Sequence, residues 1–292
     1  MIDRLLDRIK EEPQTIFYGV VGFLILSYLL ILVIDVFNLF GLRQALLGEE
    51  PEAFFWLYWF DVPVELPMQW LLLACLAATL FMSAGVAYGR RAQEAFDFSL
   101  LFAVGAILML LEDHSEVRHF LRMQLEGDAG GADGLYGTLG TMVELMYFAT
   151  LGGLLLFVFL RFRRLFWDLP QVRKFMLIGY GMYGLAAGSS WLGSAFRDNT
   201  ESFRDLYSLV GQFFMDLLFV TGGETEKLYH RIEASFAEAN DHPLGYYFMD
   251  RVYEESVELL GASALLVAAM LFLKAQRDGL PHQADGEADG NK

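Results

Sequence analysis

Hydrophobic residues in this chain gather into long blocks that contain no charged residue. Residues 16–34 form one such block, without a single Asp, Glu, Lys or Arg. An α-helix rises about 1.5 Å per residue, so about 20 apolar residues cross the roughly 30 Å hydrocarbon core of a bilayer. The pattern therefore predicts membrane-spanning helices.

Six blocks qualify as predicted spans. They cover residues 16–40, 68–89, 97–114, 141–162, 175–196 and 255–274. The first is not a cleavable signal peptide, because its apolar stretch is too long and residues 1–12 carry charges of both signs. The sequence predicts an all-α polytopic integral membrane protein with one transmembrane helical domain over residues 1–277. A disordered cytoplasmic tail over residues 278–292 is expected to follow it.

Lysine and arginine are divided unevenly between the segments that connect these spans. With the N-terminus inside, 13 of the 21 basic residues lie on the inner segments, which form the shorter share of the loops. These residues are Arg4, Arg8, Lys10, Arg90, Arg91, Arg161, Arg163, Arg164, Arg173, Lys174, Lys274, Arg277 and Lys292. Cytoplasmic loops are enriched in basic residues, which predicts a multi-pass protein of the cell (inner) membrane with both termini in the cytoplasm.

Two of the outer segments have compositions that indicate their character. Residues 51–67 are aromatic and interrupted by prolines, which predicts a segment that lies along the outer membrane surface. Residues 127–140 contain six glycines and are predicted to form a flexible outer connection.

The longest outer segment, residues 197–254, is predicted to form an outer helical section. Residues 209–220 are mostly apolar but too short to span comfortably, so a re-entrant or surface helix is expected. An amphipathic helix over residues 224–240 is predicted to follow. Its apolar positions repeat every four residues, at Leu228, Ile232 and Phe236.

The overall composition narrows the class of protein further. Hydrophobic residues make up 55% of the 292 residues and charged residues 20%, against about 45–50% and about 25% in soluble domains. An ordinary soluble enzyme is therefore excluded. The net charge of −16 repels phosphate, which argues against a nucleic-acid partner. The one cysteine, Cys75, lies inside an apolar block, which leaves no basis for a disulfide scaffold.

One glycine pattern matches a nucleotide-binding fingerprint and is rejected. Residues 179–184 read G-x-G-x-x-G, but that motif needs a strand before it and a helix that opens on it. Here the glycines lie inside the predicted span over residues 175–196, where small residues let helices approach closely. Gly184 and Gly188 form such a small pair, which predicts this span among the most enclosed helices.

Acidic residues are drawn below the outer membrane boundary because some spans are short. The uncharged part of the third span covers residues 98–111, or roughly 21 Å of helix. To cross the hydrocarbon core of about 30 Å, the helix must also include Glu112. The same argument draws Glu144 and Glu258 into their spans. Three helices thus place an acid near the same boundary, where Asp35 also ends the first span.

These acids occur in closely spaced pairs. Glu112 and Glu116 are four residues apart, as are Glu254 and Glu258. Like charges at this spacing repel unless a proton, a bound cation or an arginine offsets them. Each pair shares a helix face with small residues, which predicts that the acids point into the bundle.

The spacing of one histidine among these acids suits a metal site. Glu116 and His119 have the i,i+3 spacing of a metal-binding pair, and Glu255 with Glu258 supplies a second acidic pair. The candidate metal ligands are Glu112, Glu116, His119, Glu144, Glu255 and Glu258. One histidine among acids suits Mn, Fe or Ca better than structural zinc. In the structural alternative, Arg118, Arg122 and Arg251 form salt bridges within the same acidic segments.

Three functions stay open from the sequence. The first is binding or movement of a cation or protons through an outer vestibule. The second is a metal-dependent membrane enzyme in which a metal-bound water is the nucleophile. The third is a membrane scaffold or assembly subunit. The expected partners are the lipid bilayer, a protein that docks on residues 197–254, and a second copy of the chain.

Overall fold

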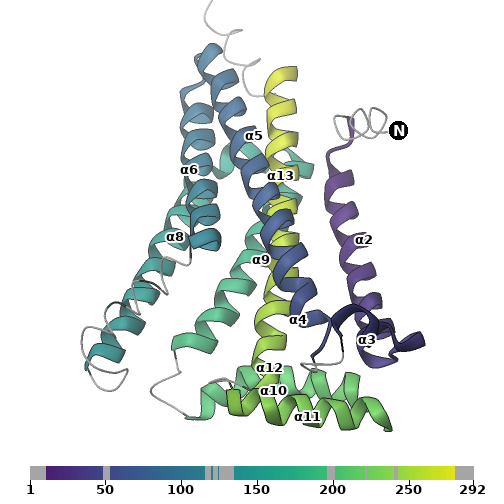
Figure 1. The fold of residues 1–292 in the computed structure, drawn as a ribbon. Coiled ribbons are helices and arrows are strands. Elements are labelled where there is room, and N and C mark those ends of the chain that lie inside the picture. The colour runs from purple at the N-terminus through teal and green to yellow at the C-terminus, as the bar shows by residue number, and fades with distance from the viewer. Residues whose placement is uncertain are drawn as a thin grey trace, which may run out of the picture.

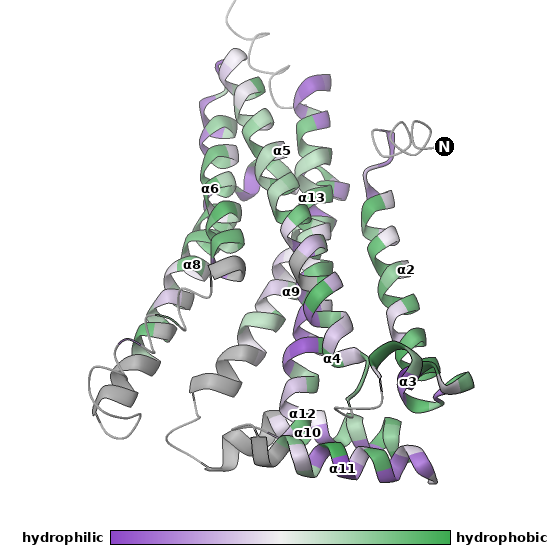
Figure 2. Ribbon diagram, viewed as in Figure 1, coloured by the Kyte–Doolittle hydropathy of each residue, from purple (hydrophilic) through white to green (hydrophobic). Residues whose placement is uncertain are grey.

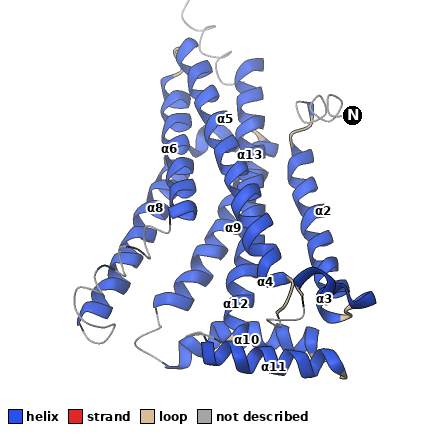
Figure 3. Cartoon of the chain, in the orientation of Figure 1, coloured by secondary structure: helices blue, strands red, loops and turns tan. Residues whose placement is uncertain are grey.

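The computed structural model describes residues 11–48, 53–115, 120, 124, 135–195, 201–220, 222–239 and 243–279. These residues form helices joined by short connections, and no strand occurs among them (Figure 3). The predicted all-α class therefore holds for this part of the chain. Most of the predicted glycine-rich connection and residues 280–292 of the predicted tail lie outside the described residues.

Six long helices run alternately in opposite directions (Figure 1). They are α2 (Gln14–Ile31), α5 (Trp70–Gly89), α6 (Gln93–Ser115), α8 (Leu135–Trp167), α9 (Pro170–Ala195) and α13 (Glu255–Asp278). The start of α2 and the end of α13 lie at the same end of the bundle, where Lys274 Nζ donates to the Glu11 carbonyl at 3.2 Å. We call this the terminal end. At the opposite end, the platform end, α10 (Glu201–Phe219) and α11 (Glu224–Ala239) lie across the bundle.

Five helical stretches of the described residues are long and apolar enough to cross a membrane. They are Gln14–Val36, Trp56–Gly89, Gln93–Glu112, Leu145–Trp167 and Leu244–Asp278. Figure 2 shows the apolar character of α2, whereas hydrophilic and hydrophobic residues alternate along α11. The remaining predicted span, over residues 175–196, corresponds to α9, which is 26 residues long but contains many glycines, serines and tyrosines. That α9 crosses the membrane therefore stays a prediction.

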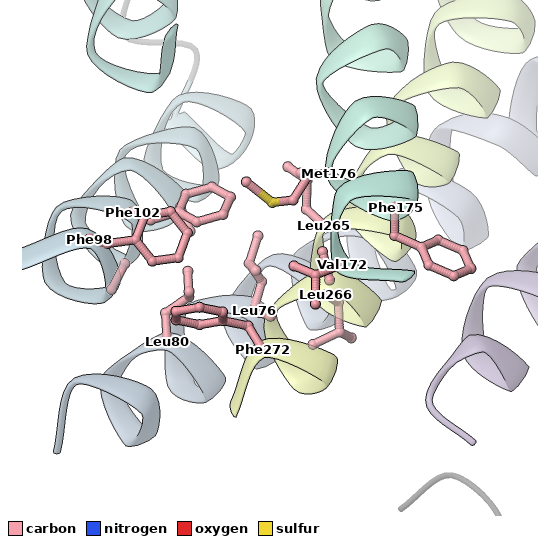
Figure 4. Packing of buried hydrophobic residues seen from close by; sticks show 14 of the residues in the cluster. Leu76, Leu80, Phe98, Phe102, Val172, Phe175, Met176, Leu265, Leu266 and Phe272 are labelled. Atoms are coloured by element: carbon pink, nitrogen blue, oxygen red, sulfur yellow. The ribbon is translucent and has the colours of Figure 1, made fainter. Parts of the chain in front are cut away.

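Helix α13 lies at the centre of the bundle and packs against α2, α5 and α9. Every residue from Gly261 to Ala269 is buried. Side chains of α5, α6, α9 and α13 fill the main hydrophobic core (Figure 4). In this core Phe98 meets Phe272 edge to face, with the ring centroids 5.1 Å apart. The central, enclosed helix is therefore α13, whereas the sequence favoured the span that corresponds to α9.

The close helix contacts use other glycines than the predicted pair. A Cβ at Gly184 or Gly188 would meet no neighbouring atom within 4 Å, so the prediction that these two permit close packing is wrong. A Cβ at Gly179 would overlap a side chain of α13, and one at Gly261 would lie 2.8 Å from the Tyr183 ring. The reason is the rotation of α9, which buries Gly179 and exposes Gly184.

From Trp56 onward, the segment predicted to lie along the membrane surface is helical, and part of it is buried. Helix α4 (Trp56–Trp59) and the π-helical segment η3 (Phe60–Gln69) run without a break into α5. The side chains of Trp56 and Phe60 are fully buried. η3 contains two prolines, each of which lacks a backbone donor, and the π-helical turns accommodate them without ending the helix. The two prolines therefore do not interrupt the helix.

The platform is built from the two helices expected in residues 197–254. α10 crosses the end of the bundle instead of running alongside the long helices (Figure 1). Leu228 and Ile232 of α11 are buried in a second hydrophobic cluster, and Phe236 packs against it, as their spacing predicts. α12 (Leu244–Tyr247) and the π-helical segment η4 (Phe248–Glu254) then lead into α13.

Candidate functional site

Three π-helical segments lie toward the platform end of the bundle. η1 (Leu32–Val36) continues α2, whereas η3 and η4 lead into α5 and α13. η3 contacts η4, and both contact α13. π-Helical turns are rare and often occur at functional sites, and irregular backbone at membrane depth is tolerated where protein buries it. The junction of η3, η4 and α13 is therefore the first place to look for a site.

Glu258 lies in the first turn of α13 and meets the last residue of η3. The Gln69 Nε2 donates to Glu258 Oε2 at 2.7 Å. Gln69 is only 1% exposed, so this hydrogen bond forms inside the bundle. An amide donor satisfies a carboxylate oxygen but carries no formal charge. Gln69 therefore orients Glu258 without neutralising it.

Glu254 lies one helical turn before Glu258 and is more deeply buried, at 7% exposure. The Ser189 Oγ of α9 lies 3.4 Å from Glu254 Oε1, but its single proton also has the Ala186 carbonyl as an acceptor, at 2.8 Å. This hydroxyl also carries no formal charge. Two carboxylates one turn apart repel each other, more strongly as the surrounding dielectric falls. The predicted orientation of this acid pair into the bundle agrees with the contacts to α9 and η3.

Arg251 supplies the salt bridge that the structural alternative expected, but with a different acid. Its Nη1 donates to the Leu57 carbonyl at 2.8 Å and to Asp61 Oδ2 at 3.2 Å. These bonds join η4 to α4 and η3. Asp61 was not among the candidate residues, because its segment was expected to lie along the membrane surface.

Asp35, at the end of the first predicted span, is fully buried and anchors α4. Its carboxylate oxygens accept the backbone N–H groups of Phe55 at 2.7 Å and Trp56 at 3.0 Å. Arg43 Nη1 donates to the Asp35 carbonyl at 3.0 Å. A carboxylate at a helix N-terminus satisfies open backbone donors and interacts favourably with the helix dipole. Asp35 thus has a structural role that explains its burial.

Two of the predicted ligands, Glu255 and Glu258, lie together in the first turn of α13. The half-buried Glu112 lies near the end of a different helix, α6. Outside the described residues lie Glu116, His119 and the side chain of Glu144. Among the side chains that the structure describes, no group of three or more His, Cys, Asp or Glu is arranged to hold a metal ion.

Two residues of the site, Gln69 and Ser189, were not predicted from the sequence, because neither side chain carries a charge. Gln69 carried a usable signal. It is the one side-chain amide in the predicted span over residues 68–89, where an amide must find a partner. Ser189 carried no comparable signal, because serines also serve as small packing residues in membrane helices.

A second polar contact lies toward the terminal end of the bundle. Ser83 Oγ donates to Gln276 Oε1 at 2.7 Å and lies 2.8 Å from Ser99 Oγ, and all three residues are buried. Between this contact and the acids, α13 presents the buried apolar run from Ala264 to Ala269. Within the described part of the chain, the hydrophobic core therefore separates the two polar regions.

No protein-family model matches this chain, and neither a curated protein nor a solved structure does. The class therefore follows from the fold itself. The described residues form an all-α protein with five helices suited to crossing a membrane, consistent with a multi-pass membrane protein.

Proposed function

We propose that the carboxylates at the platform end of this membrane protein bind and release protons. The observation that carries the proposal is the pair Glu254 and Glu258, one turn apart inside the bundle, where the neutral amide of Gln69 donates to Glu258. A carboxylate removed from water carries a high desolvation cost, and a second one nearby adds repulsion. One proton held by the pair lowers both costs.

Contacts of other described side chains lie within one turn of the acid pair along η4 and α13. On η4 and η3, Arg251 bonds to Asp61. On α2, the Tyr28 hydroxyl hydrogen-bonds with Ser256 Oγ of α13 at 2.9 Å. On α9, the Tyr183 ring lies against Gly261, less than one turn beyond Glu258.

The proposal assigns this proton exchange to the outer side of the cell (inner) membrane. Arg90 bonds to the Arg277 carbonyl, and Lys274 to that of Glu11, so basic side chains lie at the terminal end. The positive-inside rule then assigns that end, and both termini, to the cytoplasm. Because the hydrophobic core separates the two polar regions, the proposal is proton binding from one side, without conduction across the membrane.

Infrared difference spectroscopy of the purified protein in lipid nanodiscs tests proton binding. A downward pH step is expected to produce a carboxylic acid C=O band that Glu258→Gln and Glu254→Gln each weaken or abolish. The matched control is Glu94→Gln, which alters an exposed carboxylate 3.5 Å from Arg161, away from the site. An unchanged band in both site variants contradicts the proposal, as does an equal loss in the control.

The cation and metal-enzyme alternatives are tested on the same proteins. Mn²⁺ or Ca²⁺ that raises the melting temperature of the wild type, but not of Glu258→Gln, would show that the acids hold a metal ion and would overturn the proton proposal. An unchanged melting temperature with each ion, together with the infrared band, supports proton binding.

A further inference from the structure

An apolar cavity of about 310 Å³ lies between α2, α10 and η4, beside the acid pair but separate from it. Its wall is apolar or aromatic throughout. The residues used below are Tyr28, Leu32, Phe214, Leu217, Met249 and Val252. A volume of this size falls at the lower end of small-molecule pockets, which span about 300–1,000 Å³. It has room for a slender apolar chain rather than for a helix.

The depth of the cavity indicates what fills it. Tyr28 and Leu32 belong to the candidate span Gln14–Val36. Leu32 lies about 6 Å along the helix axis from the end of this span, at about 1.5 Å per residue. The cavity therefore lies at the level of the hydrocarbon region, just inside the membrane boundary. Water is a poor occupant, since a buried water needs two to four polar partners.

Both walls of the cavity continue into exposed apolar surface. On α10, Phe213 is 63% and Leu217 67% exposed. On α2, Ile25 and Leu29 are also exposed. Exposed apolar side chains on a membrane helix are covered by lipid. The surface around the cavity is thus suited to the same solvent as the cavity itself.

Two polar side chains of α10, Gln212 and Asp216, form a hydrogen-bonded group with Tyr229 of α11. Gln212 Nε2 and the Tyr229 hydroxyl each donate to Asp216 Oδ1 at 3.0 Å. This arrangement leaves Phe214 and Leu217 to line the cavity. A helix with one apolar side that lies across the end of a membrane bundle is typical of an interfacial helix.

We propose that this cavity binds one acyl chain of a bilayer phospholipid from the leaflet on the platform side. The chain lies between α2 and α10, with its end against Met249 and Val252 of η4. The inference is independent of proton binding, because it uses none of the acids. The bound chain lies beside the direct contact that η1 makes with α10.

Photolabelling in nanodiscs tests this assignment. The probe is a phospholipid that carries a diazirine in one acyl chain, and labelled residues are mapped by mass spectrometry after illumination. Labels are expected to concentrate several-fold on cavity residues over the exposed face of α9. Met249→Trp fills the cavity and is expected to reduce that labelling at least threefold. Leu217→Trp serves as a second variant at an exposed position that tolerates a larger side chain.

The matched control is Leu185→Trp, which adds the same ring to an exposed position of α9 away from the cavity. It is expected to leave cavity labelling unchanged. Labels spread evenly over all lipid-facing helices would overturn the proposal. So would cavity labelling by a free fatty acid probe with none by the phospholipid, or cross-links through Leu217 to a second copy of the chain.

Discussion

Gln69 and Glu258 are 189 positions apart in the sequence, yet their side chains meet at 2.7 Å between η3 and α13. The bond joins two of the five candidate spans at the depth where both change from π-helical to α-helical backbone. It therefore fixes the position of an acid and the rotation of two helices together.

Removal of the Gln69 amide is expected to destabilise the protein through Glu258. Gln69→Leu leaves a carboxylate with one donor fewer, at an expected loss of about 1–3 kcal/mol in the free energy of unfolding. The double variant Gln69→Leu/Glu258→Leu is expected to recover most of this loss, because both polar groups are then absent. Denaturation of the four proteins in detergent gives the coupling energy. Strictly additive losses would show that the two side chains do not interact.

Asp35→Ala is expected to be among the most destabilising single substitutions at the platform end. It leaves the N–H groups of Phe55 and Trp56 without their carboxylate acceptor, at an expected cost of about 2–4 kcal/mol. Asp35→Asn keeps one oxygen acceptor and is expected to lose less. The control, Asp97→Ala, removes an exposed bond to Gln93 and is expected to cost only about 0.5 kcal/mol. Equal melting temperatures for Asp35→Ala and Asp97→Ala would refute the anchoring role.

Glycine substitutions are expected to separate the buried from the exposed side of α9. Gly179→Leu and Gly261→Leu force side chains into occupied space, at an expected cost of about 1–3 kcal/mol or more. Gly184→Leu enters open space and gains helix propensity, so it is expected to be neutral or slightly stabilising. Thermal unfolding of the three variants ranks them. A large loss in Gly184→Leu alone would reverse the rotation assigned to α9.

Tyr229 is expected to make the platform sensitive to alkali. Burial, with the nearby carboxylates of Glu233 and Asp216, raises the pKa of Tyr229 above its ordinary value. At a pH above about 10 the unfolded chain loses this proton while the folded chain keeps it, so stability falls as pH rises. Tyr229→Phe removes the ionisable group and is expected to reduce that fall, measured as melting temperature against pH. An identical alkaline slope in both proteins would exclude the contribution of Tyr229.

The positions of most long helices could be predicted from the sequence, because the thickness of a bilayer sets the length of an uncharged block. The inward orientation of Glu254 and Glu258 followed from their small neighbours on the same helix face. Their partners could not be predicted, since pairing Gln69 with Glu258 depends on which helices become neighbours. The sequence also could not predict which of Gly179 and Gly184 lies at a helix contact, because both are glycines and only the rotation of α9 distinguishes them.

The π-helical backbone also could not be predicted from the sequence. The aromatic residues and prolines of residues 51–67 predicted a segment along the membrane surface. A proline excludes one backbone hydrogen bond, but a helix that widens locally continues past it. The burial of Trp56 and Phe60 then follows from a continuous helix.

The contact of α2 with α13 has a consequence for the order in which the protein assembles. A chain that is made from its N-terminus produces α2 well before α13. Tyr28 and Ser256 are 228 positions apart, so their hydroxyl groups can meet only after α13 has been made. Until then α2 has its contacts with α4, where Trp59 Nε1 donates to Ser27 Oγ at 3.0 Å, but not those with α13. The packing of α2 is thus completed only once α13 is in place.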